Sequence, residues 1–318
     1  MSKVGTTRLA PSPTGALHLG NARTFLVNWL LAKHRGWRVL MRVEDLDGPR
    51  VKAGAAEQLL DELAWLGLTW DGPIVRQSQR ADAYRAALER LVAAGAAYPC
   101  VCSRRDIETA GGAPHADDGA ASYAGRCRGR WSSADDARRA CGRPVAWRVR
   151  VPDEPVEFAD EFAGPQCVDL ARCGGDFVVF KNDGLAAYQL AVVADDAAAG
   201  VDAIVRGDDL LVSAARQIHL RRLLGLEPSP AHWHLPLVVG ADGRRLAKRH
   251  GDTRLEHYRR RGAAPQRLLG LLGFWCGLLD RRREATLGEL VERFDLARLP
   301  RETVVFSPDD DAFLELVS

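Results

Sequence analysis

The chain has 318 residues, 47% of them hydrophobic and 27% charged, a globular composition that excludes a disordered or fibrous protein. No apolar run reaches the roughly 18–20 residues that span a bilayer, and the first residues lack the apolar segment of an export signal. The formal net charge of +2 excludes a strongly basic protein, so overall charge does not indicate a nucleic-acid partner. We therefore expect a cytoplasmic protein without membrane contact, whose seven cysteines bind metal or remain thiols.

The first hundred residues alternate between short apolar runs and helical periodicity. Strands are predicted at 7–10 and 37–43, and helices at 18–35, 57–66 and 81–94. Gly36 and Gly95 follow two of these helices directly, as glycine commonly does at helix ends. This order predicts an α/β fold with a parallel sheet and crossover helices.

The pattern changes between about residues 100 and 183, which hold six of the seven cysteines and a loop rich in glycine, alanine and aspartate. Strand candidates lie at 145–151 and 177–181, so we expect an insertion with its own small fold. Alternating α/β character returns at 188–193, 204–206, 213–224 (a helix) and 235–239, and helical periodicity dominates from 254 onward, including 265–279. The expected segments are therefore 1–99, 100–183, 184–251 and 252–318.

The first motif, residues 11–21 (PSPTGALHLGN), runs from a strand through a turn into a helix. Helix N-termini bind phosphates because their free N–H groups and dipole favour anions. Gly15 and Gly20 allow a ligand to approach the backbone closely. His18 and Asn21 share one helix face, where two donors can stabilise charge that develops on a phosphate. A surface turn with an ordinary histidine is the alternative, which suits a lone histidine better than this whole arrangement.

The second motif, residues 243–251 (GRRLAKRHG), is a glycine-bounded basic loop after an apolar strand. The chain has 39 arginines and only five lysines, so Lys248 within this loop is informative. A mobile loop with a lysine can reach over the phosphates of ATP and neutralise charge as pyrophosphate leaves. Taken alone, the loop fits a solvated surface better than a catalytic role, and the pairing with the first motif is what makes it informative.

Together the two motifs resemble the HIGH and KMSKS signatures of class I aminoacyl-tRNA synthetases, written here as HLGN (18–21) and RLAKR (245–249). Segments 8–15, 42–47, 188–196, 205–210 and 248–252 are similar to those of glutamyl-tRNA synthetases. Asn21 replaces the second histidine of HIGH, and Arg245 and Ala247 replace a lysine and a serine of KMSKS. The charge is kept and one hydroxyl is lost. Because Lys248 remains, we expect activity with a weaker affinity for ATP.

The resemblance implies a doubly wound parallel sheet of the Rossmann type with a small zinc-containing insertion and a C-terminal helical segment. It also implies that ATP, with Mg²⁺, is a substrate and that His18, Asn21 and Lys248 are catalytic. The implied ATP-binding residues are Pro11, Gly15, His18, Gly20, Asn21, Arg245, Leu246, Ala247, Lys248 and Arg249.

The resemblance further implies a glutamate site. Glutamate has two carboxylates and one ammonium, and the planar fork of arginine suits carboxylates. Arg8 and Arg206 would pair with carboxylates, and Glu44 would hold the ammonium. An ordinary ion pair between Arg8 and Glu44 is the alternative. The implied glutamate-binding residues are Arg8, Ser12, Glu44, Tyr188 and Arg206.

Cysteines at positions 100, 102 and 127 suggest tetrahedral zinc, which needs a fourth ligand. The resemblance supplies the pattern Cys-x-Cys…Tyr-x-x-x-Cys and hence Tyr123. Buried free thiols are the alternative to a structural zinc that orders this loop-rich segment. The expected ligands are Cys100, Cys102, Tyr123 and Cys127, with His115, Asp117 and Cys141 in reserve.

Full-length glutamyl-tRNA synthetases continue into a helical anticodon-binding region, for which few residues follow Lys248, so we expect none here. With the cysteine pattern, this is similar to the glutamyl-queuosine tRNA(Asp) synthetases, which activate glutamate without tRNA and attach it to queuosine in the anticodon. The resemblance thus implies that the protein binds L-glutamate, ATP and queuosine-containing tRNA(Asp), and we expect a monomer. Arginine patches at 254–267 and 281–283 could contact its phosphates. The alternatives are a minimal glutamyl-tRNA synthetase charging the 3′ end of tRNA(Glu), and a non-catalytic tRNA-binding paralogue.

Overall fold

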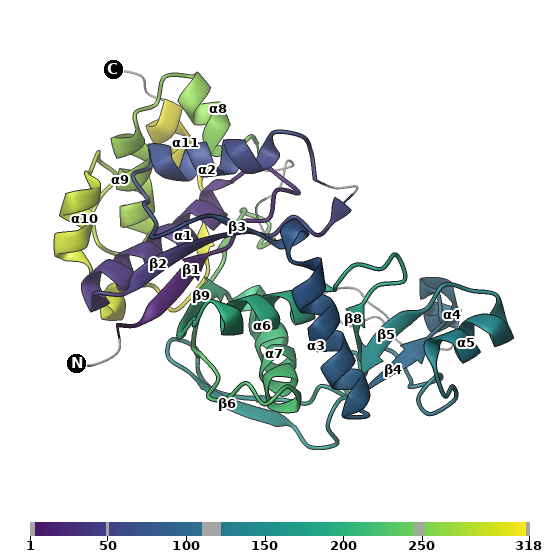
Figure 1. Cartoon of the computed structure of the whole chain (residues 1–318). Helices are drawn as coiled ribbons and strands as arrows, with labels where there is room; N and C mark the ends of the chain where they lie inside the picture. Colours follow the sequence, from purple (N-terminus) through teal and green to yellow (C-terminus); the bar gives the residue numbers. More distant parts are fainter. Residues whose placement is uncertain (1–3, 49–50, 110–121, 245, 247–250, 316–318) are drawn as a thin grey trace.

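The structure is a computed structural model that describes residues 4–48, 51–109, 122–244, 246 and 251–315 (Figure 1). Apolar side chains of its strands and helices form two large buried clusters. Among the described helices, none combines the length and the apolar character needed to cross a membrane.

A parallel sheet with the order β1–β2–β3 opens the fold. Strand β1 (Thr6–Leu9) is buried along its whole length, because β2 pairs with it, α1 packs against it and the strand over Ala203–Gly207 (β9) also contacts it. Helix α1 ends at Gly36, whose φ of 65° lies in the left-handed region that glycine adopts without strain. The strand–helix–strand order predicted for this segment is confirmed. The other elements are α1 (Leu19–Arg35), β2 (Arg38–Val43), α2 (Ala55–Trp65) and β3 (Val75–Arg76).

A second sheet has the order β7–β6–β10–β9. Strands β9, β10 and β6 run parallel, whereas β7 runs antiparallel to β6, because a short connection can only reverse the chain direction. The backbone N–H of Asp202 donates to the carbonyl of Thr6 at 2.8 Å, so this sheet meets β1 of the first. The elements are β6 (Val156–Asp160), β7 (Gly164–Val168), α6 (Tyr188–Ala198), β9 (Ala203–Gly207), α7 (Leu211–Leu223) and β10 (Ala231–Leu235).

A third, antiparallel sheet has the order β4–β5–β8. Figure 1 shows β4 and β5 with α4 and α5 at one end of the molecule, away from β1 and β2. The fold is therefore α/β as predicted, but its sheets are mixed and not purely parallel. The elements are α3 (Ala81–Ala93), β4 (Ala97–Cys100), α4 (Arg104–Thr109), α5 (Ala134–Cys141), β5 (Ala146–Val149) and β8 (Phe177–Phe180).

The C-terminal segment is mainly helical, as predicted, and α9 packs against α1. Gly270 within α9 lets the backbone at Arg283 approach the helix closely, because a Cβ there would lie 1.8 Å from the carbonyl oxygen of Arg283. Strand β12 pairs with β11 in parallel. The elements are β11 (Val238–Val239), α8 (Leu255–Arg260), α9 (Pro265–Trp275), α10 (Leu287–Arg293), β12 (Val304–Val305) and α11 (Pro308–Glu315), and short 3₁₀ turns occupy Gln77–Gln79, Asp208–Leu210 and Leu296–Arg298.

The division into segments 1–99, 100–183, 184–251 and 252–318 stays a prediction. Strand β6 lies in the second of these segments, yet it pairs with β10, which lies in the third. The second segment thus contributes both to the antiparallel sheet and to the sheet that carries β9 and β10.

Candidate active site

A cavity of about 470 Å³ lies at the carboxyl ends of β1, β2 and β9. This is where ligands bind in open α/β sheets, because the loops that leave parallel strands diverge there. The first turn of α1 and the first residue of α6 complete its wall. The cavity brings together every residue of the expected glutamate site (Arg8, Ser12, Glu44, Tyr188, Arg206) and the first-motif residues of the expected ATP site (Pro11, Gly15, His18, Gly20, Asn21).

Buried ion pairs fix the charged wall of this cavity. Arg8 donates from Nε to Asp196 Oδ1 at 3.3 Å, and Arg42 pairs with the same carboxylate. Arg42 also donates from Nη2 to Glu44 Oε1 at 2.9 Å. Arg8 and Glu44 therefore pair with other groups of the described chain, contrary to the alternative in which they pair with each other. Although burial alone would raise it, Arg42 and Arg8 hold the pKa of the Asp196 carboxyl below its ordinary value, so Asp196 stays ionised.

Most charges of this wall are balanced within the chain, and Arg206 differs from the others. Arg8 and Arg42 pair with Asp196, and Arg42 also pairs with Glu44. The adjacent Asp195 pairs with Arg80 and lies 3.9 Å from Arg42 Nε, and the exposed Asp209 also lines the cavity. The hydrogen-bond partners of Arg206 are His234 and Gln217, so a ligand carboxylate can pair with its charge. Glutamate has a side-chain carboxylate for such a group and glutamine does not.

Ser12 and Tyr188 lie at the open side of the cavity. Ser12 Oγ donates to Glu44 Oε2 at 3.4 Å, so both oxygens of Glu44 have a donor. Tyr188 begins α6 and is 36% exposed, which leaves it accessible to a bound molecule. Arg206 is only 6% exposed, and burial lowers its pKa, although an arginine remains protonated at neutral pH.

The first motif forms the start of α1. His18 is the residue before the helix, and its Nδ1 accepts the N–H of Asn21 at 3.4 Å. A neutral His18 therefore carries its proton on Nε2, where it can donate to a phosphate oxygen. A Cβ on Gly15 would meet no atom within 4 Å, so the turn is open on that side, as expected for a ligand-facing glycine. A Cβ on Gly20 would lie 3.2 Å from the His18 ring, so this glycine makes room for the histidine instead.

Only part of the second motif, residues 243–251, lies within the described residues. Arg245, Ala247, Lys248 and Arg249 lie outside the described residues, whereas Leu246 is buried in the cluster that contains α1. At the start of the motif, the N–H of Gly240 donates to the carbonyl of Arg244 at 2.8 Å. Gly240 follows Val238, a residue of the cavity wall, by two positions.

The chain after the second motif returns to the first motif. The N–H of Leu19 donates to the carbonyl of Thr253 at 3.0 Å, and the N–H of Leu255 donates to the carbonyl of Leu17 at 2.9 Å. His18 and Arg254 thus form an antiparallel bridge. Both described flanks of the second motif therefore lie beside the cavity.

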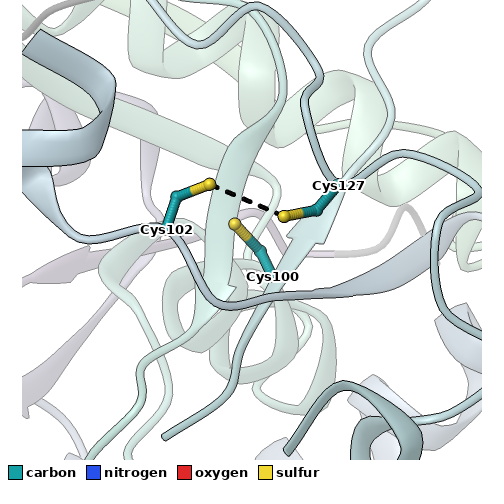
Figure 2. A group of neighbouring side chains, drawn as sticks. All are labelled: Cys100, Cys102 and Cys127. Carbon is teal, nitrogen blue, oxygen red and sulfur yellow. Dashed lines mark hydrogen bonds between the residues drawn. The ribbon is translucent and has the colours of Figure 1, made fainter. Parts of the chain in front are cut away.

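A group of cysteines that we call the cysteine module, Cys100, Cys102 and Cys127 with Tyr123, lies beyond β4. The three Sγ atoms lie within 4.8 Å of one another, and Figure 2 shows their side chains pointing toward a common centre. The Sγ atoms of Cys102 and Cys127 are 3.5 Å apart. Ligand sulfurs of a tetrahedral zinc are separated by about 3.8 Å, given a Zn–S distance of about 2.3 Å. The spacing therefore suits one tetrahedral ion.

Tyr123 joins the same group. Its hydroxyl lies 3.4 Å from Cys100 Sγ and accepts the N–H of Cys127 at 2.9 Å. The guanidinium of Arg148 lies 3.9 Å from the centre of the Tyr123 ring. Burial and then the neighbouring Cys100 raise the pKa of Cys102 to about 12, so this thiol keeps its proton unless a cation is bound. Of the reserve ligands, Cys141 ends α5 outside this group, and His115 and Asp117 lie outside the described residues.

The arginines between residues 254 and 283 are largely neutralised by neighbouring acids. Such pairs contribute little to stability, but they reduce the positive charge that is available to phosphates. Phosphate binding by these patches stays a prediction. The pairs are Arg254–Asp252, Arg259–Asp61, Arg260–Glu256, Arg261–Glu315, Arg267–Glu284, Arg282–Asp310 and Arg283–Glu289.

Sequence reasoning assigned no role to Arg42, Asp196 or His234. Arg42 and Glu44 stand two residues apart at the end of β2, so they share a face, and this spacing is a usable signal for their pairing. His234 bonds to Arg206 and to Asp160 across separations that no local pattern reveals.

Comparison with known proteins agrees with this geometry. Residues 4–307 match the family model of tRNA synthetases class I (E and Q), catalytic domain. The glutamyl-Q tRNA(Asp) synthetases of Symbiobacterium thermophilum and Nocardia farcinica are 48% and 51% identical to the chain, covering 93% and 94% of it and 94% and 92% of the relatives. The crystal structure of a glutamate tRNA ligase from Elizabethkingia meningosepticum in complex with its amino acid superposes with a TM-score of 0.82 at 26% identity, over 98% of this chain and 69% of that one.

Proposed function

Because the chain belongs to the glutamyl-Q tRNA(Asp) synthetase family, within the class I tRNA synthetases for E and Q, we propose that it transfers glutamate to queuosine of tRNA(Asp). ATP activates the glutamate in a first step that does not need tRNA. The observation that carries this proposal is the single cavity in which the charged glutamate wall and the first motif meet.

In the first step, the α-carboxylate of glutamate attacks the α-phosphate of ATP, which gives glutamyl-adenylate and pyrophosphate. Arg8 and Arg206 pair with the carboxylates, and Glu44 and Tyr188 bind the remaining polar groups. His18 and Asn21 at the start of α1, with Lys248 of the second motif, stabilise the charge on the phosphates by position and electrostatics. Mg²⁺ accompanies ATP and neutralises part of the phosphate charge.

The remaining first-motif residues shape the turn that would receive the nucleotide. Pro11 and Gly15 would bring the backbone of the turn near the phosphates, and Gly20 makes room for the His18 ring. Arg245, Leu246, Ala247 and Arg249 of the second motif are the other residues that we expect to bind ATP. In the second step, a hydroxyl of queuosine attacks the activated carbonyl carbon, the glutamyl ester forms and AMP leaves.

The donor set of the cysteine module fits zinc. Three converging thiols and a phenol oxygen at tetrahedral spacing are ligands that a structural zinc uses, although tyrosine is uncommon among them. Cys100, Cys102, Tyr123 and Cys127 would hold the ion, which would supply folding free energy to a segment with a small core of its own. A cytoplasmic monomer, as expected from the sequence, completes the proposal.

A charging assay tests the function. Purified protein is first tested for glutamate-dependent exchange between ATP and labelled pyrophosphate without tRNA, with glutamine as the matched control. It is then incubated with radiolabelled glutamate and three acceptors: queuosine-containing tRNA(Asp), tRNA(Asp) lacking queuosine, and tRNA(Glu). We expect exchange with glutamate alone and label on the first acceptor alone. Label on tRNA(Glu) alone would indicate a minimal glutamyl-tRNA synthetase, and no exchange would indicate a non-catalytic paralogue.

A further inference from the structure

Arg206 is the guanidinium of the cavity wall whose hydrogen-bond partners are neutral side chains. Its Nε lies 2.9 Å from Nε2 of His234, and its Nη1 donates to Oε1 of Gln217 at 2.9 Å. Its Nη2 has no hydrogen-bond partner within the described chain, although the side chain lines the cavity. Arg8 and Arg42, in contrast, pair directly with the carboxylate of Asp196. The charge of Arg206 is therefore held in place without being cancelled by a direct carboxylate partner.

The contact with Arg206 fixes the protonation of His234. Arginine Nε always carries a hydrogen, so His234 Nε2 must accept and cannot itself carry a proton. The single proton of the imidazole then lies on Nδ1, which faces Asp160 Oδ2 at 2.6 Å. Burial and the charge of Arg206 lower the pKa of His234 and favour this neutral form, and they outweigh Asp160 and the Leu210 backbone, which favour the charged form.

Three backbone hydrogen bonds fix the Asp160 carboxylate, so its position determines the tautomer of His234. Its Oδ1 accepts three backbone N–H groups, from Ala163 at 2.7 Å, Phe162 at 3.0 Å and His234 at 3.1 Å. Only Oδ2 is left to face the imidazole. Both side chains are inaccessible to solvent, so water does not compete for these hydrogen bonds.

We propose that His234, locked in its Nδ1–H tautomer by Asp160, is a positioning residue that orients the Arg206 guanidinium toward a carboxylate of the substrate. The inference rests on the proposed function in naming glutamate as that substrate. A carboxylate in the place of His234 would orient Arg206 equally well, but it would cancel the charge that attracts glutamate. A neutral imidazole that only accepts supplies orientation and leaves the charge to the ligand.

Substitutions at His234 and His232 distinguish a loss of Arg206 orientation from a general loss of structure. His234→Leu removes the acceptor, and loss of a hydrogen bond to a charged group should raise the KM for glutamate about 10- to 100-fold. The KM for ATP should change less than twofold. His234→Gln restores an acceptor oxygen near the position of Nε2 and should recover most of the glutamate affinity. The matched control is His232→Phe, which keeps a buried ring between Phe158 and His234 on the same strand and should leave both constants unchanged.

Asp160→Asn tests the tautomer itself. Its oxygen would stay with the three backbone N–H groups, so its NH₂ group would face His234 Nδ1 and force the proton onto Nε2, opposite the Arg206 Nε–H. We therefore expect a rise in glutamate KM similar to that of His234→Leu. The ¹⁵N NMR spectrum of histidine-labelled protein should show a proton on Nδ1 of His234 in the wild type and on Nε2 in Asp160→Asn. The His234→Gln variant identifies the signal.

Three results would overturn the inference: a wild-type His234 that is charged or protonated on Nε2, an unchanged glutamate KM in His234→Leu, or equal rises in the KM for glutamate and ATP. The NMR measurement needs no activity. If the wild type showed no glutamate-dependent exchange, the proposed function would fail, while the tautomer and calorimetric glutamate binding would still decide the role of His234.

Discussion

The cavity and the cysteine module both remove charge-bearing groups from water, but they balance them differently. In the cavity, Arg42 and Asp196 compensate each other within the chain, and Arg206 bonds to the neutral side chains of His234 and Gln217. In the cysteine module, three thiols and the Tyr123 phenol converge, and the guanidinium of Arg148 lies over the aromatic ring. The geometry of the cavity is therefore set by the chain, whereas that of the module, as we propose it, would depend on a bound ion. Changes to one region should leave the other intact.

Lys248→Ala should produce the largest effect, and only in the cavity. Removing one group that stabilises transition-state charge typically lowers kcat by roughly 10²- to 10³-fold, and we expect glutamate-dependent pyrophosphate exchange to fall by about that much. The zinc content and the melting temperature should not change. Lys33→Ala, at the exposed end of α1, is the matched control and should retain full exchange. Unchanged exchange in Lys248→Ala would refute its role in the second motif.

Arg206→Ala should weaken glutamate binding strongly while sparing ATP. The variant leaves a substrate carboxylate unpaired at a cost of roughly 2–5 kcal/mol, so the KM for glutamate should rise about 30-fold or more. Arg206→Lys keeps the charge but loses the fork that bonds to His234 and Gln217, and its KM should lie between those of the wild type and the alanine variant. Steady-state exchange kinetics measure both constants. An unaltered glutamate KM in Arg206→Ala would count against this pocket.

Removal of metal should destabilise the cysteine module and leave the cavity intact. We expect about one zinc per chain by elemental analysis. Cys102→Ser should lower this content and the melting temperature, because the module has few apolar contacts of its own to replace the ion. Glutamate binding, measured by calorimetry, should persist in the chelated protein. A metal-free protein with an undiminished melting temperature would remove zinc from the proposal.

Much of the cavity could be predicted from the sequence because its motifs are local. The turn before α1 and its histidine stand within eleven residues, and a strand–turn–helix pattern places them at a helix N-terminus. The antiparallel strand β7 was missed, because its alternation lies inside a segment dominated by cysteines and loops. The contact between His234 and Asp160 spans 74 residues and joins two strands of one sheet, so it depends on topology that no local pattern contains.

The arginine patches could be judged only in part from the sequence. Composition indicated positive charge at 254–267, and the structure adds that Arg259 pairs with Asp61 from α2 and Arg261 with Glu315 from α11. These acids are distant in sequence, so a window of composition cannot count them. The net charge of a surface patch can therefore be estimated only once the acidic partners in the folded structure are known.

The smallest expected effect concerns Asp176, whose contribution to the free energy of unfolding should depend on pH. It accepts from the Tyr98 hydroxyl, from Arg128 Nε at 2.9 Å and from the Val151 N–H at 2.9 Å, close to the cysteine module. Although burial alone would raise it, these donors lower the pKa of Asp176 below its ordinary value of about 4. A lowered folded-state pKa stabilises the protein above that pH, and the contribution is lost as pH falls through the folded-state pKa.

Asp176→Asn should therefore cost about 1.5 kcal/mol of unfolding free energy at pH 7. The difference from the wild type should begin to shrink as the pH falls below about 4, because the unfolded carboxylate then takes up a proton, and it should vanish below the lower folded-state pKa. Urea unfolding at several pH values measures it. Asp196→Asn is the counterpart in the cavity, where the same lowered pKa gives the same sign of pH dependence. That variant should also weaken glutamate binding, since Arg8 and Arg42 lose their shared partner, whereas Asp176→Asn should leave glutamate binding unchanged. Loss of glutamate binding in Asp176→Asn would mean that the two regions are coupled and that the comparison fails.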